Sequence, residues 1–319
     1  MSDLATDKMN EADPFQLGEP VVHRGVVVTP LFPRTDPHAH YLALEEAIAR
    51  GLRIEEVDAS GSVPELLVAN PLERNVLLFD GEELVGAKQN RILNVSVLVG
   101  GKTELPIPVS CVEEGRWQNV SPSFETASHA AHPSLRRRKA ESLRHEPLAR
   151  GVAQHDVWDE VQEMNLRMDV VSPTGASADA YRRWDEPLLE LERAFPLEPG
   201  QAGAILVVGG DICLDYVSRP DAFERLYPRL LRGYMLDVVQ RLDRPATSDE
   251  RVRKFVADVV SAKRTRRPSA GLGQDVRLES AGVIGSGLEL DGELLQLSAF
   301  TSGREARTFG RIARPSRRR

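Results

Sequence analysis

Residues 75–117 read NVLLFDGEELVGAKQNRILNVSVLVGGKTELPIPVSCVEEGRW, the most strand-like part of the chain. Its apolar runs alternate with polar turns, as the runs of paired strands do. Two residue pairs, Asp80-Gly81 and Gly100-Gly101, tolerate the positive φ angles of tight turns. The stretch therefore predicts neighbouring antiparallel strands joined by two hairpins. The first hairpin joins Asn75–Phe79 to the strand that carries Lys88 and Arg91, and the second joins Ile92–Val99 to Thr103–Val109.

Polar side chains are dense in the middle of this stretch, at Lys88, Gln89, Asn90 and Arg91. Successive residues of a strand face opposite sides, so four in a row cannot all point to solvent. At least one pair is expected to point inward, to lie in a bulge or to meet a partner. Arg91 offers a fork for carboxylate or phosphate, and Gln89 or Asn90 offers an amide for a base or sugar edge. The alternative is an exposed hairpin face.

A second polar group follows at the end of the next predicted strand. Glu113 comes directly after apolar residues and is followed by Arg116 and Trp117. A carboxylate in this position serves as a general base or ligand acceptor, or it pairs with Arg116 at the sheet edge. Both interpretations remain open. The strand pairing predicts that Glu83, Lys88, Arg91 and Glu113 lie in one neighbourhood.

Cys111 lies between these two polar groups. A catalytic thiol needs a lowered pKa, which Lys88, Arg91 or Arg116 would provide if the strands pair as predicted. A free cysteine on a strand is more often a small buried hydrophobic residue. Cys111 is therefore kept as a candidate nucleophile beside that simpler interpretation.

The composition is that of a globular protein, with 319 residues, 41% hydrophobic and 28% charged. The net charge of −7 makes nucleic acid an unlikely partner, which leaves small molecules or proteins. The first twenty residues lack a signal peptide's apolar core, and no apolar run would span a membrane, so we expect a cytoplasmic protein. No phosphate loop, dinucleotide fingerprint or hydrolase elbow is present, and the pairs His38/His40 and His129/His132 lie in loop-like segments; no cofactor or metal is predicted.

Strands at both ends of the chain, with helices between them, predict an α+β fold. We expect a mostly antiparallel sheet, to which the C-terminal hairpin returns, with a central helical region packed on it. A single domain is predicted over residues 20–302, between a polar leader (1–19) and an Arg-rich tail (303–319), both disordered. The predicted helices cover 41–51, 154–168, 180–194, 220–242 and 248–262. The basic cluster Arg136 to Lys139 is predicted to be a solvated helix or an ordered segment that passes over the sheet, with an anion-binding face as the alternative. The cations of 263–267 are assigned to a helix end.

The segments Asp80–Arg91 and Pro108–Trp117, and more loosely Gln154–Val161 and Pro199–Gly203, resemble the bacterial ARG and rhodanese-phosphatase-superfamily-associated protein domain family. We take ARG to refer to ADP-ribosylglycohydrolases. The resemblance extends over roughly residues 20 to 300. It implies a gene-neighbourhood link to ADP-ribose or phosphoester chemistry, without assigning a reaction.

Two functions follow as hypotheses. In the first, a sheet-borne pocket binds an anionic, nucleotide-like or ADP-ribose-like small molecule. Its ligand-binding residues would be Lys88, Gln89, Asn90, Arg91, Arg116 and Trp117, and its candidate catalytic residues Glu113, Glu83 and Cys111. In the second, a non-catalytic interaction module docks a protein partner on the polar strand face and on the helix predicted at 220–242. Converging side chains favour the pocket, and a flat face with Lys88 and Arg91 pointing into solvent favours docking.

Overall fold

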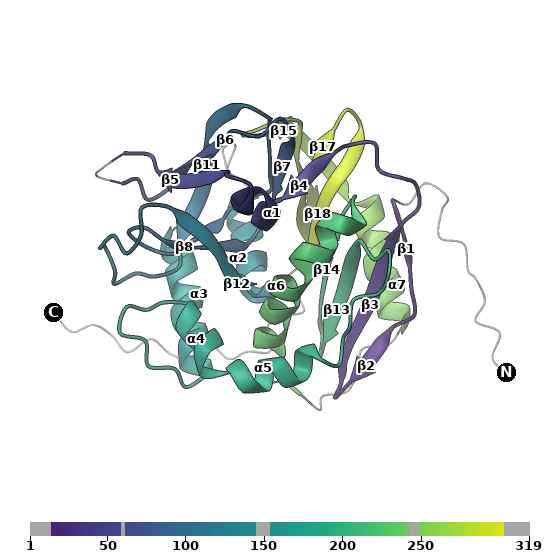
Figure 1. Ribbon diagram of the computed structural model, residues 1–319. Coiled ribbons are helices and arrows are strands. Elements are labelled where there is room, and N and C mark those ends of the chain that lie inside the picture. Colours follow the sequence, from purple (N-terminus) through teal and green to yellow (C-terminus); the bar gives the residue numbers. More distant parts are fainter. Residues whose placement is uncertain (1–13, 59–60, 145–153, 240, 243–248, 303–319) are drawn as a thin grey trace.

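The computed structural model describes residues 14–58, 61–144, 154–239, 241–242 and 249–302. Strands occupy both ends of this chain and helices gather between them, so the predicted α+β class is confirmed (Figure 1). Residues 1–13 of the predicted leader and the whole tail from 303 lie outside the described residues. The end of the leader is different: Phe15–Leu17 forms a strand, β1, and Phe15 is fully buried.

The largest sheet has nine strands and runs in the order β1-β3-β13-β14-β18-β17-β16-β15, with β2 beside β3. Its C-terminal hairpin, β17–β18, returns to the sheet that holds β3, as the sequence predicts. All its pairings are antiparallel. Beyond β1, its strands are β2 (Val21–His23), β3 (Val26–Pro33), β13 (Gly203–Val208), β14 (Asp211–Val217), β15 (Lys263–Pro268), β16 (Gln274–Glu279), β17 (Val283–Leu290) and β18 (Glu293–Thr301).

Helices cover both faces of this sheet. The long helix α6 (Pro220–Val238) and the shorter α2 (Pro133–Leu143) lie on one face, and α7 (Asp249–Ser261) lies on the other. The position of strand β13 between helices on both faces explains why its sequence is apolar throughout. Leu206 and Val208 belong to the core beneath α6, whereas Ile205 and Val207 belong to the core beneath α7. A strand that is covered on both faces has no side chains that face solvent, so its sequence is a continuous apolar run.

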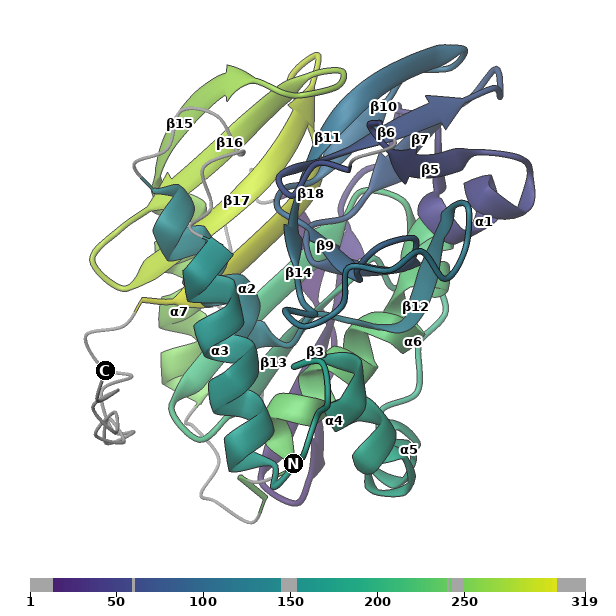
Figure 2. The same ribbon diagram turned by 90° about the vertical axis from the view of Figure 1, so that its left-hand side faces the viewer.

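Two smaller sheets lie on the far side of α6, which contacts both β12 and β14 (Figures 1 and 2). One has the order β12-β8-β9-β11-β6-β5 and the other β10-β7-β4. Their strands are β4 (Tyr41–Ala43), β5 (Arg53–Glu56), β6 (Glu65–Asn70), β7 (Asn75–Leu78), β8 (Glu82–Gly86), β9 (Arg91–Leu93), β10 (Val97–Val99), β11 (Thr103–Cys111) and β12 (Phe124–Ala130). The remaining helices are α1 (Leu44–Ala49), α3 (Gln154–Arg167), α4 (Ala178–Arg183) and α5 (Asp185–Glu192).

The first predicted hairpin is wrong in its pairing, and the second is confirmed only in part. Strand β7 pairs with β10 and β4, not with β8, so Asp80-Gly81 carries the chain from one sheet to another. Gly81 has the positive φ that the sequence predicts (84°), but its N–H donates to the carbonyl of Leu93. Gly100-Gly101 connects β10 to β11, which pairs with β6 and, through Val109 and Leu93, with β9. The predicted pairing of Ile92–Val99 with Thr103–Val109 is therefore confirmed at its Ile92 end and wrong for Val97–Val99, which pairs with β7.

The predicted polar strand is also wrong in detail. Lys88, Gln89 and Asn90 lie in the connection between β8 and β9, and only Arg91 belongs to a strand. The parity argument therefore does not apply to them, although Gln89, Asn90 and Arg91 are buried. The cations of 263–267 also differ from their predicted place at a helix end. Residues 263–268 form β15, the edge strand of the nine-stranded sheet.

The cluster Arg136 to Lys139 does form a helix, α2, but half of it is not solvated. Arg136 and Lys139 are 0% and 2% exposed, because they lie on the face of α2 that packs on the sheet. Arg136 forms a bidentate pair with Asp215, and Lys139 pairs with Asp80 and donates to the carbonyl of Leu93. Buried charges of this kind are paired with opposite charges.

Candidate functional site

The strands β8, β9 and β11 lie side by side and place the predicted site residues. In their register Leu84 lies opposite Arg91, and Arg91 lies opposite Cys111. Directly opposite residues share a face, so Arg91 and Cys111 point to the same side of the sheet. Glu83 is next to Leu84 and points to the other side. The prediction of one neighbourhood therefore holds for Arg91 and its neighbours but not for Glu83.

Arg116 holds the β8–β9 connection in place. Its five N–H groups have five acceptors: a carboxylate oxygen of Glu113 (2.8 Å), the side-chain oxygen of Asn90 (2.9 Å), and the carbonyls of Gly86 (3.4 Å), Ala87 (2.8 Å) and Gln118 (3.1 Å). A guanidinium with all its donors engaged has none left for a ligand. Arg116 therefore positions the connection rather than binding an anion in this state.

Glu113 is engaged in the same way. One of its oxygens accepts from Arg116 and from the N–H of Asn90, and the other accepts from the hydroxyl of Thr174 at 2.9 Å. Its backbone forms a β-bridge with Ala176. Of the two interpretations left open by the sequence, pairing with Arg116 is the one present here. Gln89 also has partners at both ends, the carbonyl of Glu114 and the guanidinium of Arg91.

The remaining three predicted ligand-binding residues, Lys88, Arg91 and Trp117, form a cluster with Glu56. We call these four residues the Arg91 corner. The Lys88 ammonium lies 5.3 Å from the centre of a Trp117 ring and the Arg91 guanidinium 5.8 Å, both within cation–π range. Arg91 is 0% exposed, whereas Trp117 is 48% exposed. The corner therefore joins a buried cation to an aromatic ring at the surface.

Arg91 is the unusual member of the corner. One Nη donates to Gln89, but its Nε and other Nη are buried without a hydrogen-bond acceptor among the described residues. The nearest carboxylate oxygen, on Glu56, is 3.9 Å from that Nη, too far for a hydrogen bond. Burial lowers the pKa of Arg91, and the charge of Glu56 opposes that shift. Glu56 was not singled out from the sequence, where it is one of two adjacent acids on a short strand.

Cys111 does not meet the requirement of a nucleophile in this state. Burial raises its pKa to about 11, although Arg91 acts to lower it, as predicted. The thiol is thus protonated at neutral pH. Its backbone N–H and C=O pair with the side-chain amide of Gln154, which continues the sheet beyond β11.

Glu83 belongs to a separate buried cluster on the other side of the sheet. One of its oxygens accepts from the hydroxyl of Ser177 (2.8 Å) and lies 3.1 Å from Nε2 of His129. The His129 ring stacks on Tyr181 at 3.5 Å between centroids. His129 is on β12 and only 4% exposed, so the predicted loop position of His129 is wrong.

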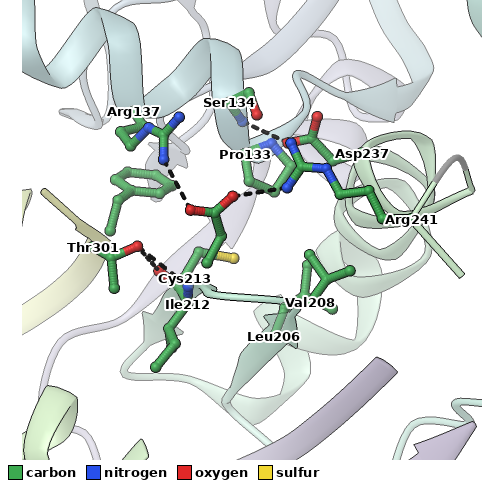
Figure 3. Close-up of a pocket in the computed structure, with 12 residues that line it drawn as sticks. Pro133, Ser134, Arg137, Leu206, Val208, Ile212, Cys213, Asp237, Arg241 and Thr301 are labelled. Carbon is green, nitrogen blue, oxygen red and sulfur yellow. Dashed lines mark hydrogen bonds and ion pairs between the residues drawn. The ribbon is translucent and has the colours of Figure 1, made fainter. Parts of the chain in front are cut away.

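A hollow that the sequence did not reveal opens beside the N-terminal end of α2 (Figure 3). Its polar residues are Ser134 and Arg137 from α2, Asp211 from β14, Asp237 from α6 and Arg241. Arg137 and Arg241 both donate to Asp211, at 3.2 and 2.7 Å. The only sequence signals here were the basic cluster and the Gly209-Gly210-Asp211 turn, which gave no reason to connect the two.

Two further findings concern the described residues alone. They contain no group of three or more histidine, cysteine, aspartate or glutamate side chains placed to hold a metal ion. Among them there is also no helix of sufficient length and apolar character to cross a membrane.

A family model matches residues 14–300, almost the whole described chain, and its description is ARG and Rhodanese-Phosphatase-superfamily-associated Protein domain. The chain belongs to this family. The resemblance seen in the sequence is thus confirmed. The ARG and Rhodanese-Phosphatase-superfamily-associated domain begins at Pro14, so it includes β1, and it contains the whole Arg91 corner. No curated protein and no solved structure matches the chain.

Proposed function

We propose that the Arg91 corner binds an anionic small molecule of nucleotide-like or ADP-ribose-like chemistry. The observation that carries this proposal is Arg91 itself, fully buried, with two of its nitrogens lacking an acceptor in the described chain. A buried donor without a partner costs about 1–3 kcal/mol, and more when it is charged. A phosphate or carboxylate oxygen on the ligand would remove that cost with a charge-assisted hydrogen bond.

The other corner residues suit the rest of such a ligand. Trp117 presents a ring that is 48% exposed, on which a base can stack, and stacking of this kind contributes about 1–3 kcal/mol per base. Lys88 lies against the same ring and adds a second positive charge beside Arg91. Because Arg91 is fully buried beside the Trp117 ring, a ligand would reach the guanidinium when the Trp117 side chain moves.

The neighbouring residues act as the support. Arg116, Glu113, Gln89 and Asn90 are joined to one another and to the β8–β9 connection by hydrogen bonds. A connection held in this way keeps Lys88 and Arg91 in place before the ligand arrives, which lowers the entropy lost on binding. The roles that the sequence assigned to Gln89, Asn90 and Arg116 thus change from contact to positioning.

The proposal is for binding, and catalysis is a separate question. Among the three candidate catalytic residues, Glu113 is the one joined to the β8–β9 connection, since Glu83 faces the other side of the sheet and the Cys111 thiol is protonated. Family membership supports the ligand class only by association, through the ARG element of the family name, which we take to mean ADP-ribosylglycohydrolase.

The rival proposal is a protein-docking surface. One observation favours it: Val120, which lies close to Trp117 in the sequence, is 67% exposed. Two observations oppose it. Lys88 and Arg91 converge on Trp117 instead of pointing into solvent, and most of α6, the proposed docking helix, is buried between the sheets.

Calorimetric titration with ADP-ribose, NAD, AMP and inorganic phosphate tests the proposal. We expect the wild type to bind at least one nucleotide, Arg91→Ala to lose binding, and Lys88→Ala to weaken it about tenfold. Arg91→Lys retains the charge in case Arg91→Ala does not fold. Lys102→Ala is the control, because Lys102 is an exposed lysine paired with Glu73 on another turn. Absence of wild-type binding across the panel would count against the ligand site.

A further inference from the structure

Glu56 is the one member of the Arg91 corner that has no role in the proposed function. We infer that the Glu56 carboxylate accepts a hydrogen bond from a ribose hydroxyl of the ligand, so that the corner selects ribonucleotides over deoxyribonucleotides. This inference rests on the proposed function and narrows its ligand class. Glu56 is then the residue that determines specificity, beside Arg91, which holds the phosphate.

The two oxygens of Glu56 have different surroundings. Oε1 accepts the backbone N–H of Lys88 at 3.4 Å, which ties the carboxylate to the β8–β9 connection. Oε2 is buried and has no hydrogen-bond partner in the parts of the chain that the structure describes. The side chain as a whole is 11% exposed. A buried carboxylate oxygen without a donor is costly, and a hydroxyl of the ligand supplies that donor.

The backbone beside Oε2 does not supply a donor. Gly61 lies against this oxygen, since a Cβ on Gly61 would come within 3.3 Å of it. The N–H of Gly61 already donates to Asp58, to its carbonyl at 3.0 Å and to its side chain at 2.9 Å. The unmet hydrogen bond of Oε2 is therefore left for a ligand.

Arg91 and Glu56 present a donor and an acceptor side by side. One Nη of Arg91 lies 3.9 Å from Oε1 of Glu56, too far for a direct hydrogen bond. The same Nη and the Nε of Arg91 are buried without an acceptor in the described chain. A hydroxyl is both acceptor and donor, so one hydroxyl can accept from this Nη and donate to Glu56. The Nε is left for an oxygen of the phosphate.

The charge of Glu56 makes the hydroxyl a requirement. A phosphate bound to Arg91 lies close to the Glu56 carboxylate, and two negative charges in a buried place repel each other. A ribose offsets this repulsion through a hydroxyl that donates to the carboxylate, whereas a deoxyribose in the same position leaves Oε2 unpaired. Carboxylates hold ribose hydroxyls in this way in dinucleotide-binding proteins. Any ligand oxygen that accepts from the Nη of Arg91 is within reach of Glu56, because only 3.9 Å separates the two side chains.

Calorimetric titration of the full chain with AMP, 2′-deoxy-AMP and 3′-deoxy-AMP tests the inference. We expect the wild type to bind AMP at least about tenfold more tightly than one of the two analogues, because a hydrogen bond to a buried charge is lost. The analogue that binds more weakly identifies the hydroxyl that contacts Glu56. Glu56→Ala is expected to weaken AMP without weakening that analogue, so that the two bind within about twofold of each other. Glu56→Gln keeps the shape and one acceptor oxygen, and it replaces Glu56→Ala if that variant does not fold.

Glu55→Ala is the matched control. Glu55 precedes Glu56 on β5, faces the other side of the strand and is 48% exposed in its pair with Arg53, so neither the AMP affinity nor the preference for AMP should change. A purely structural role of Glu56 would weaken all three nucleotides by the same factor, and that result overturns the inference. Equal binding of the three nucleotides to the wild type also overturns it, as does a preference for AMP that persists in folded Glu56→Ala.

The inference and the proposed function fail on different results. No binding of AMP to the wild type overturns the inference. The proposed function is overturned only if ADP-ribose and NAD also fail to bind. Binding of AMP without a preference over either analogue leaves the ligand site in place and removes the role given to Glu56. Circular dichroism shows whether each variant is folded before its affinity is compared.

Discussion

Arg136 and Asp215 face each other at the centre of the molecule through two hydrogen bonds of 2.6 and 2.7 Å, and both residues are 0% exposed. The pair joins α2 to β14, and the hydroxyls of Ser298 and Tyr234 donate to the same carboxylate. Phe79 and Phe300 lie 5.2 and 5.3 Å from the guanidinium. Burial alone would lower the pKa of Arg136, but the charge and hydrogen bonds of Asp215 together with the charge of Asp80 outweigh burial and raise it.

Replacing Arg136 with methionine is expected to destabilise the protein strongly, because Asp215 would be left as a buried charge with two hydroxyl partners. Breaking a buried pair from one side costs about 3–5 kcal/mol. Urea denaturation measures the free energy of unfolding. The control is Arg182→Met, whose side chain is 78% exposed in its pair with Asp179 and whose effect should stay within about 0.5 kcal/mol. Equal effects of the two substitutions would contradict a structural role for the buried pair.

Gly81→Ala tests how closely the chain passes Arg136. Gly81 has a φ of +84°, and an added Cβ would come within 2.7 Å of Cδ and Nε of Arg136. Gly292 has a similar φ of +87° with no atom within 4 Å of such a Cβ, so Gly292→Ala serves as the matched control. We expect Gly292→Ala to cost about 1–2 kcal/mol from the backbone alone, and Gly81→Ala about 2 kcal/mol more. Similar melting temperatures for the two variants would contradict this expectation, because they would mean that the Arg136 side chain moves away from the added Cβ at little cost in stability.

Titration of Cys111 makes the free energy of unfolding depend on pH in the alkaline range. Its pKa is raised from 9.0 to about 11 in the folded state, so the unfolded chain loses its proton first. The contribution is fully present below pH 9.0 and is lost as pH rises toward about 11, a change of about 2–3 kcal/mol. Urea denaturation of wild type and Cys111→Ala between pH 8 and 11 isolates this effect from other titrating groups. The difference between the two proteins should fall across that window; a constant difference would contradict the buried, protonated thiol.

Glu160 makes the free energy of unfolding depend on pH in the acid range, with the opposite sign: stability is lost as pH falls. Burial raises its pKa, but His132 at 3.6 Å and Arg167 and Arg138 at 3.2 Å outweigh burial and lower it from 4.5 to about 2. The stabilisation is therefore present above pH 4.5 and is lost as pH falls toward about 2, about 3 kcal/mol in all. Glu160→Gln lacks this titration, so its deficit relative to wild type should shrink on acidification. A deficit independent of pH from 2 to 5 would rule out this carboxylate as the cause.

The sequence predicted elements better than their pairing. Positive-φ glycines and apolar runs identified the turn at Gly81 and the strands around it, because both signals are local. The runs Asn75–Leu78 and Val97–Val99 are nearly all buried and carry no alternation that distinguishes one neighbour from another. Their partners are each other and β4, segments that lie apart in the sequence and that no local pattern connects.

The same reasoning located the candidate site, but it did not show which role each of the site's residues has. The high density of polar residues at 88–91 and 113–117 predicted a site there, and residues of these two segments do contact each other in the structure. Their roles depend on how many donors each has left, and that number depends on carbonyls such as those of Gly86, Ala87 and Gln118. Backbone acceptors leave no trace in the sequence. Arg116 and Arg91 thus looked equivalent, although one has all its donors engaged and the other does not.

The most direct test of the Arg91 corner uses Trp117 as its own reporter. The chain has three tryptophans, so Trp158→Phe and Trp184→Phe together leave Trp117 as the single fluorophore. Titration of this variant with ADP-ribose or AMP should quench or shift the Trp117 emission, with the dissociation constant that calorimetry gives, and Arg91→Lys should weaken both signals together. Calorimetric binding that leaves the Trp117 emission unchanged and is insensitive to Arg91→Lys would contradict the account.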